Sequence, residues 1–173
     1  MSAEELRKAL RRGIELFRSG RFDESHIWFD RAAMLAPDNA EAHAWLAAVY
    51  GKRIDAAWAL HDKVDLLEKL DKELEQALEL DPALPLARRI NGVRLLQTPE
   101  MLGGDPAAAA EEFRYCIEQG LNESELWLLW AECYVRMERL DLGIAALQQR
   151  LAAAPDDKAA ATKLTELQQT GTT

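Results

Sequence analysis

Small, aromatic and proline residues recur in this chain at fixed offsets, and this spacing restricts the possible folds more than any other feature. The first clear set lies in residues 13–37 and consists of Gly13, Ser25, Phe29, Ala32 and Pro37. Apolar residues between positions 6 and 17 recur every three or four residues, which is the period of one face of an α-helix. Gly20 interrupts that pattern before a second apolar stretch begins. The sequence therefore predicts two helices that touch where their side chains are small, and a stop at Pro37.

This arrangement resembles one unit of the tetratricopeptide repeat family. With Pro37 counted as position 32 of the 34-residue unit, Gly13, Ser25 and Ala32 take small positions and Phe29 takes the aromatic position. Later units close at Pro82, Leu121 and Pro155, which lie 45, 39 and 34 residues after the preceding closing residue.

The resemblance implies an all-α fold, namely a right-handed α-solenoid of four helix pairs with a C-terminal capping helix. It places the repeats at about residues 3–38, 39–84, 85–122 and 123–156, and the capping helix at 157–169, all within a single domain of residues 1–173.

Two of these units are longer than the repeat. The second has 11 extra residues without proline and with apolar stripes of helical period. Its two helices should therefore be elongated into a projecting hairpin with a turn near residues 61–63. Trp58 lies on this hairpin, and we expect it to pack in the core, as aromatic residues at helical spacing usually do. The third unit has 5 extra residues around Gly103, Gly104 and Asp105, which predict a turn followed by a helix cap.

Charge and cysteine content exclude several classes of function. The net charge of −9 at a sequence pI of about 4.9 repels nucleic acids and anionic membranes, so neither is an expected partner. Cys116 and Cys133 are too few for a disulfide framework and should be buried and reduced. The N-terminal residues show no apolar leader or lipid-anchor motif, and no apolar run reaches membrane length. We therefore expect a cytoplasmic protein.

No motif in the sequence points to catalysis. Nucleophile elbows, phosphate-binding loops and zinc-protease motifs are absent from the sequence. His26, His43 and His61 fall on different predicted helices without the spacing of metal ligands. We expect no catalytic residue, no metal site and no cofactor, and hence a protein that is not an enzyme.

The first predicted helix has a strongly basic face. Arg7, Lys8, Arg11, Arg12 and Arg18 interleave with acidic residues at helical spacing. Such a face is usually solvated and weakly ion-paired, and this is the interpretation we favour. A patch that binds anions is the alternative.

The family resemblance also implies a binding surface, because the first helices of tetratricopeptide pairs line a concave groove. The residues at the corresponding positions that we predict to bind a partner are Arg7, Leu10, Ile14, Phe17, Arg18, Lys52, Arg89, Val93, Leu96, Leu128 and Arg136. The apolar residues of this predicted surface should be partly exposed; they are Leu10, Ile14, Phe17, Val93 and Leu128. The chaperone-binding subclass holds a carboxylate with Lys and Asn where this chain has Leu10 and Ile14, so no carboxylate clamp is expected. An apolar channel with a basic rim instead suits an acidic, apolar segment.

These features favour a non-catalytic protein–protein interaction scaffold that binds a peptide or helix of a partner. Two alternatives stay open. The inserted helices and the GlyGlyAsp segment loosely resemble bacterial repeat proteins such as the helper component of tripartite transporters, which would mean apolar small-molecule binding. Otherwise the groove is covered, either by the terminal helix of the same chain or by a second copy, and in the second case the protein would be a self-associating module and a homo-oligomer.

Overall fold

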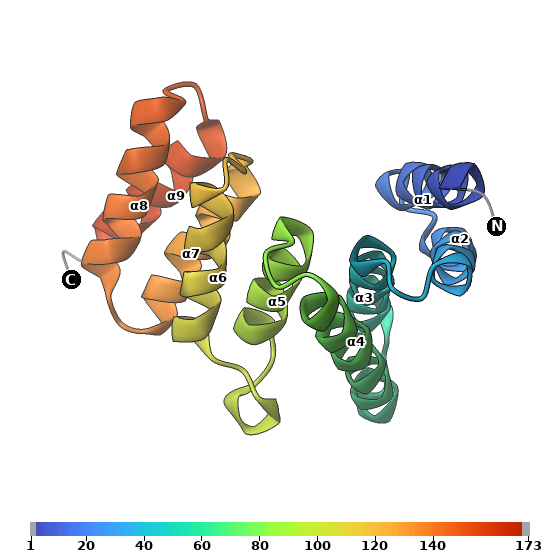
Figure 1. The fold of residues 1–173 in the computed structure, drawn as a ribbon. Coiled ribbons are helices and arrows are strands. Elements are labelled where there is room, and N and C mark those ends of the chain that lie inside the picture. Colours follow the sequence, from blue (N-terminus) through green and yellow to red (C-terminus); the bar gives the residue numbers. More distant parts are fainter. Residues whose placement is uncertain (1–2, 171–173) are drawn as a thin grey trace. The chain divides into compact units, whose positions relative to one another are not determined.

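The computed structural model describes residues 3–170, which form α-helices and one short 3-10 helix with no strand among them (Figure 1). The elements are α1 (Ala3–Arg18), α2 (Phe22–Leu35), α3 (Ala40–Ala56), α4 (Leu60–Leu80), α5 (Pro85–Gln97), η1 (Glu100–Leu102), α6 (Pro106–Glu118), α7 (Ser124–Arg136), α8 (Leu140–Ala153) and α9 (Lys158–Thr170). The all-α fold class is thereby confirmed. None of the helices within residues 3–170 is both long and apolar enough to span a membrane.

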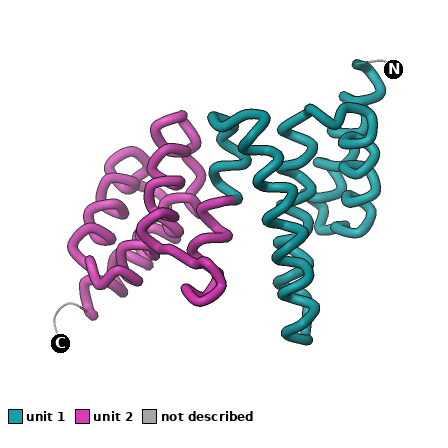
Figure 2. The backbone as a smooth tube through the Cα atoms, turned by 60° about the horizontal axis from the view of Figure 1, so that its bottom comes forward, with its two compact units in different colours: residues 1–90 teal, residues 91–173 magenta. Residues whose placement is uncertain are grey.

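The chain divides into two compact units, residues 1–90 and residues 91–173, and the boundary falls inside α5 (Figure 2). In the first unit α1 pairs with α2 and α3 pairs with α4. Phe29 of α2 packs directly against Gly13 of α1. A Cβ atom added at Gly13 would lie only 2.5 Å from the Cε1 atom of the Phe29 ring, so only glycine allows this contact. Ser25 and Ala32 are buried in the same helix, so the small and aromatic positions of the repeat act as the sequence predicts.

The second unit repeats this arrangement. Phe113 of α6 packs against Gly92 of α5 so closely that a Cβ on Gly92 would lie 2.6 Å from the ring. Asp105 caps α6, because its carboxylate accepts hydrogen bonds from the amides of Ala107 and Ala108, each at 3.0 Å. Gly104 is needed just before it, since a Cβ there would lie 1.8 Å from the carbonyl oxygen of Thr98. The turn and cap predicted for this segment are therefore present.

The final helix α9 covers the end of the second unit. Its buried residues Ala160 and Leu167 belong to one apolar cluster with Leu147 of α8 and Ala131 of α7. Arg150 of α8 forms a polar link to α9. Its side chain is only 11% exposed and its Nε donates to Asp157 at 2.7 Å, at the start of α9.

Asp157 is held as an anion at this junction. Its carboxylate accepts hydrogen bonds from the Ala160 amide at 3.1 Å and the Ser124 hydroxyl at 2.9 Å. These bonds, the Ala160 amide first, and the Arg150 guanidinium hold the pKa of Asp157 below its ordinary value despite burial. The ion pair and these hydrogen bonds therefore join α8 and Ser124 of α7 to the start of α9.

Two expectations about the inserted hairpin are wrong. The turn between α3 and α4 lies at residues 57–59, a few residues earlier than the sequence indicated. Trp58 is fully exposed and does not enter the core. The physical reason is that Trp58 falls in the three-residue connection itself, so it shares neither the buried face of α3 nor that of α4. Trp45 and Trp130 pack against apolar clusters, and Trp127 is buried beside Trp130 with a ring-centroid distance of 5.5 Å.

Candidate protein-binding surface on the first helix

The predicted binding residues of α1 lie along an open depression between α1 and α3, which we call the groove face. It has a volume of about 530 Å³ and is lined by Arg7, Leu10, Arg11, Ile14, Glu15 and Arg18 of α1 and by Glu41 of α3. The structure thus brings together four of the eleven predicted residues, Arg7, Leu10, Ile14 and Arg18. They meet because positions 7, 10, 14 and 18 recur every three or four residues on one helix.

The floor of the groove face is apolar, but it is less exposed than the sequence suggested. Leu10 is 9% exposed because its side chain packs into the core cluster that contains Phe29 and Leu46. The expected partial exposure of Leu10 is therefore wrong. Ile14 packs against the same cluster but remains half-buried, so it is the main apolar contact that this face offers.

Phe17 does not line the groove face. Its ring makes edge contacts with Phe22 and with Trp45, each at a centroid distance of 5.2 Å, and it is half-buried against the core cluster. Phe17 thus joins α1 to the start of α2 and to α3, and its first role is interhelical packing. An aromatic side chain at a helix end often contacts a ligand, but the Phe17 ring already packs against two other rings.

The rim of the groove face is positively charged. Arg7, Arg11 and Arg18 are exposed and form no ion pair with another described residue, whereas Glu15 is paired with Arg12 at 3.1 Å. Glu41 accepts a hydrogen bond from Trp45 Nε1 at 3.3 Å. Three guanidinium groups without a carboxylate partner around one apolar residue would attract an anionic segment.

The other predicted cations are placed elsewhere. Lys52 is exposed on α3 and lies 3.6 Å from Asp55. Arg89 is half-buried on α5. Neither residue lines the groove face.

In the second unit the predicted residues divide between core and surface. Leu96 is 2% exposed and belongs to the core cluster with Phe113, so its prediction as a contact residue is wrong. Val93 and Leu128 are half-buried. Arg136 is exposed, but its guanidinium donates to the Leu96 carbonyl at 2.6 Å and lies 3.4 Å from Glu132. The Arg136 side chain anchors α7 to α5. Because its guanidinium already contacts the Leu96 carbonyl and Glu132, less of its positive charge is available to a partner.

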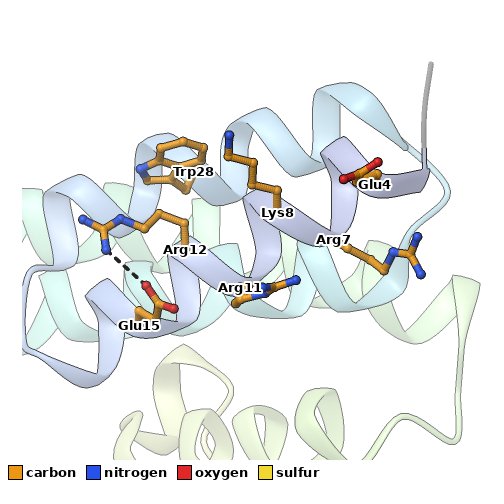
Figure 3. A pocket seen from close by; sticks show the side chains of 7 residues that line it. All are labelled: Glu4, Arg7, Lys8, Arg11, Arg12, Glu15 and Trp28. Carbon is orange, nitrogen blue, oxygen red and sulfur yellow. Dashed lines mark hydrogen bonds and ion pairs between the residues drawn. The ribbon is translucent and has the colours of Figure 1, made fainter.

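Sequence reasoning missed a second depression, between α1 and α2, which adjoins the groove face and shares Arg7, Arg11 and Glu15 with it; we call it the Trp28 depression (Figure 3). Its volume is about 660 Å³ and its lining residues are Glu4, Arg7, Lys8, Arg11, Arg12, Glu15 and Trp28. The guanidinium of Arg31 also lies over the Trp28 ring, 5.7 Å from its centroid. The signal that was available is Trp28 itself, an aromatic residue beside the repeat aromatic Phe29, on the helix that follows a basic one.

The histidines have structural partners. In the first unit His43 Nδ1 lies 2.7 Å from Glu73 Oε2 and its Nε2 lies 3.0 Å from the Pro37 carbonyl oxygen, so His43 links α3 to α4 and to the preceding turn. His26 Nε2 lies 3.2 Å from the Tyr50 hydroxyl oxygen, and burial lowers the pKa of the His26 imidazole. Among residues 3–170, no group of three or more His, Cys, Asp or Glu side chains is arranged to hold a metal ion.

Comparison with known proteins gives a likeness of structure only. No family model and no curated protein matches this sequence. The chain is similar in structure to a thermophilic tetratricopeptide protein of Thermus thermophilus, with 20% identity over 95% of this chain and 99% of that one and a TM-score of 0.58. It is also similar to PilF of Pseudomonas aeruginosa, with 15% identity over 97% and 69% of the two chains and a TM-score of 0.78.

A third similar structure is MamA of Desulfovibrio magneticus, with 16% identity over 98% of both chains and a TM-score of 0.65. At these identities the likeness concerns the fold. The chain thus has the helix-pair fold of tetratricopeptide repeat proteins, as the repeat spacing predicted.

Proposed function

We propose that this protein is a non-catalytic scaffold that binds an acidic, apolar peptide or helix of a partner protein on the groove face. The observation that carries the proposal is the cluster of Arg7, Arg11 and Arg18 around Ile14, with none of the three guanidinium groups in an ion pair with another described residue. A helix-pair fold supports it, because stacked helical repeats present extended surfaces suited to binding.

The chemistry of the face defines its ligand. The exposed guanidinium groups would pair with carboxylates of the partner, and the half-buried Ile14 would accept an apolar side chain between them. Exposed charges mainly set the rate and specificity of association, while the buried apolar contact supplies most of the affinity. Binding should therefore weaken with salt without vanishing.

The test is affinity capture from a lysate with the full chain, followed by mass spectrometry and by titration of the recovered partner. Arg18→Glu changes the groove face alone and should weaken binding of that partner by about tenfold, since loss of a charge pair plus repulsion typically costs more than about 1 kcal/mol. Ile14→Ala should weaken it through the apolar contact. The matched control is Lys8→Glu, an equal charge reversal on the same helix that lines only the Trp28 depression.

A partner whose affinity is the same for the wild type and for both groove-face variants would place binding elsewhere. A lipid or other apolar small molecule that copurifies with the wild type and is lost in Ile14→Ala would instead support small-molecule binding. Circular dichroism of each variant must first show unchanged helix content.

A further inference from the structure

The most exposed aromatic residue in the described part of the chain stands at the end of the α3–α4 hairpin. Trp58 is 100% exposed, and Leu60, two residues later, is 73% exposed. Asp62, Asp65 and Glu68 follow on the first turns of α4 and carry negative charge. Asp62 lies 3.2 Å from His61, whereas Asp65 and Glu68 form no ion pair with another described residue. We call these five residues the hairpin tip. It combines an unburied apolar pair with acidic side chains, which is the chemistry that a basic, aromatic surface recognises.

The Trp28 depression is a surface of that kind. Four cations, Arg7, Lys8, Arg11 and Arg12, outnumber the two carboxylates that line it, and Figure 3 shows Trp28 on the side of Lys8 and Arg12. Arg12 is paired with Glu15, whereas Arg7, Lys8 and Arg11 have no ion-pair partner among residues 3–170. An indole ring beside unpaired cations offers stacking for an aromatic side chain and charge for a carboxylate.

We propose that the hairpin tip of one copy of this protein docks in the Trp28 depression of a second copy. Trp58 and Leu60 would lie against Trp28, and Asp62, Asp65 and Glu68 would face the cations of α1. Charge complementarity favours this occupant, because a chain with net charge −9 repels a second copy except where its local basic surface meets an acidic one. The two surfaces share Arg7, Arg11 and Glu15, so a partner on the groove face would compete with this contact, whereas Lys8 belongs to the Trp28 depression alone and Arg18 to the groove face alone.

A single copy cannot make this contact with itself. Within the first unit the hairpin of α3 and α4 extends away from α1 (Figure 1), and α1 carries all the lining residues of the Trp28 depression except Trp28. The pairing therefore joins two different surfaces of two copies. If two copies each insert a tip into the other, a closed dimer forms. If each tip binds a different neighbour, open chains form and lengthen as the protein concentration rises.

The size of the tip limits the strength of the contact. A buried tryptophan contributes about 150–250 Å² of contact area, against about 800 Å² per partner in a stable interface. Self-association should therefore be weak and reversible, with Trp58 as its anchor residue. Because exposed charges contribute, it should also weaken as salt rises.

The experiment measures the mass of the purified full chain by sedimentation equilibrium over a range of protein concentrations. At about 0.1 M ionic strength, where the Debye length of about 10 Å screens the long-range repulsion between two chains of net charge −9 more than the short contacts at the interface, the average mass should rise above 19.4 kDa with concentration. At about 1 M, where that length is about 3 Å, it should fall back towards the monomer. A chain that stays monomeric at every concentration and at both salt levels overturns the proposal.

Substitutions then locate the contact. Trp58→Ala should lower the association constant by about tenfold or more, as loss of an aromatic anchor does. Met101→Ala removes another exposed apolar side chain, on η1, and should leave association unchanged. Equal association of the Trp58→Ala variant and the wild type would exclude the tip. Loss of association in Arg18→Glu, with Lys8→Glu unaffected, would place self-association on the groove face instead.

Charge reversal gives the sharpest test. Lys8→Glu with Arg12→Glu makes the depression acidic, and Asp62→Lys with Asp65→Lys makes the tip basic, so neither double variant should associate alone. Mixing the two should restore association, because the acidic depression of one now meets the basic tip of the other. A mixture that remains monomeric, with both variants folded by circular dichroism, would refute the pairing of these two surfaces.

Discussion

At the scale of single residues, the contact between a glycine and an aromatic ring fixes how a helix pair packs. Gly13 meets Phe29 in the first unit and Gly92 meets Phe113 in the second, and a Cβ at either glycine would overlap the ring. The two rings are fully buried. Because the helices approach this closely, neither position tolerates added volume without a shift of the backbone or the ring.

Burial at this scale also controls the chemistry of a thiol. Cys133 is fully buried, and burial raises the pKa of its thiol to about 12. In a Cys116→Ala variant, which leaves Cys133 as the only thiol, alkylation at about pH 8 should therefore be very slow in the native protein, since the thiolate is the reactive form. The same chain in denaturant should react fast, with a pKa near the ordinary value of about 8.5. Labelling at equal rates in both states would contradict the burial of Cys133.

At the scale of elements, helix ends depend on local chemistry and helix lengths on the insertions. The α3–α4 hairpin is elongated because 11 residues without proline or a glycine pair extend both helices beyond the repeat. The third unit uses its extra residues differently. Gly103 adopts a positive φ of 86°, and η1 and the Asp105 cap make a sharp entry into α6.

The cap of α6 gives a prediction at this scale. Asp105→Ala removes the acceptor of the Ala107 and Ala108 amides and should lower the free energy of unfolding by about 1 kcal/mol. Asp105→Asn retains a side-chain oxygen that can accept these hydrogen bonds and should lower the free energy of unfolding only slightly. Urea unfolding of the three proteins measures the difference. If alanine and asparagine are equally destabilising, the charge of Asp105 rather than its cap hydrogen bonds is what stabilises α6.

At the scale of the whole molecule, stability is distributed over neighbouring helix pairs. The apolar residues form several clusters, each built from consecutive helices, as expected for stacked repeats. Leu147, buried in the cluster of α7, α8 and α9, belongs to one such group. Damage to one cluster should therefore act mainly on the helices that build it.

Leu147→Ala tests this distribution. Deleting a buried leucine side chain typically costs about 2–5 kcal/mol, and the loss should appear as faster amide hydrogen exchange in α7, α8 and α9. Exchange in α1, α2 and α3 should stay as in the wild type. Gln148→Ala, an exposed neighbour on the same helix, serves as control. Faster exchange in every helix would mean that the described chain unfolds as one cooperative unit.

The sequence by itself determined the all-α class and most of the helices. Gly13, Phe29 and Pro37 specify their pair because helix period, small contact positions and helix stops are local properties of the chain. For the same reason it predicted the Asp105 cap and the line of Arg7, Ile14 and Arg18 along one face of α1.

Only the tertiary structure decided what covers each face. Leu10 and Leu96 were predicted to line the groove for the same reason as Ile14, yet neighbouring helices bury them. Trp58 is exposed because it lies in a turn only three residues long. The Trp28 depression and the reach of Arg150 to Asp157 depend on residues brought together from two different helices. Periodicity fixes which residues share a helix face, whereas burial depends on which other helix lies against that face.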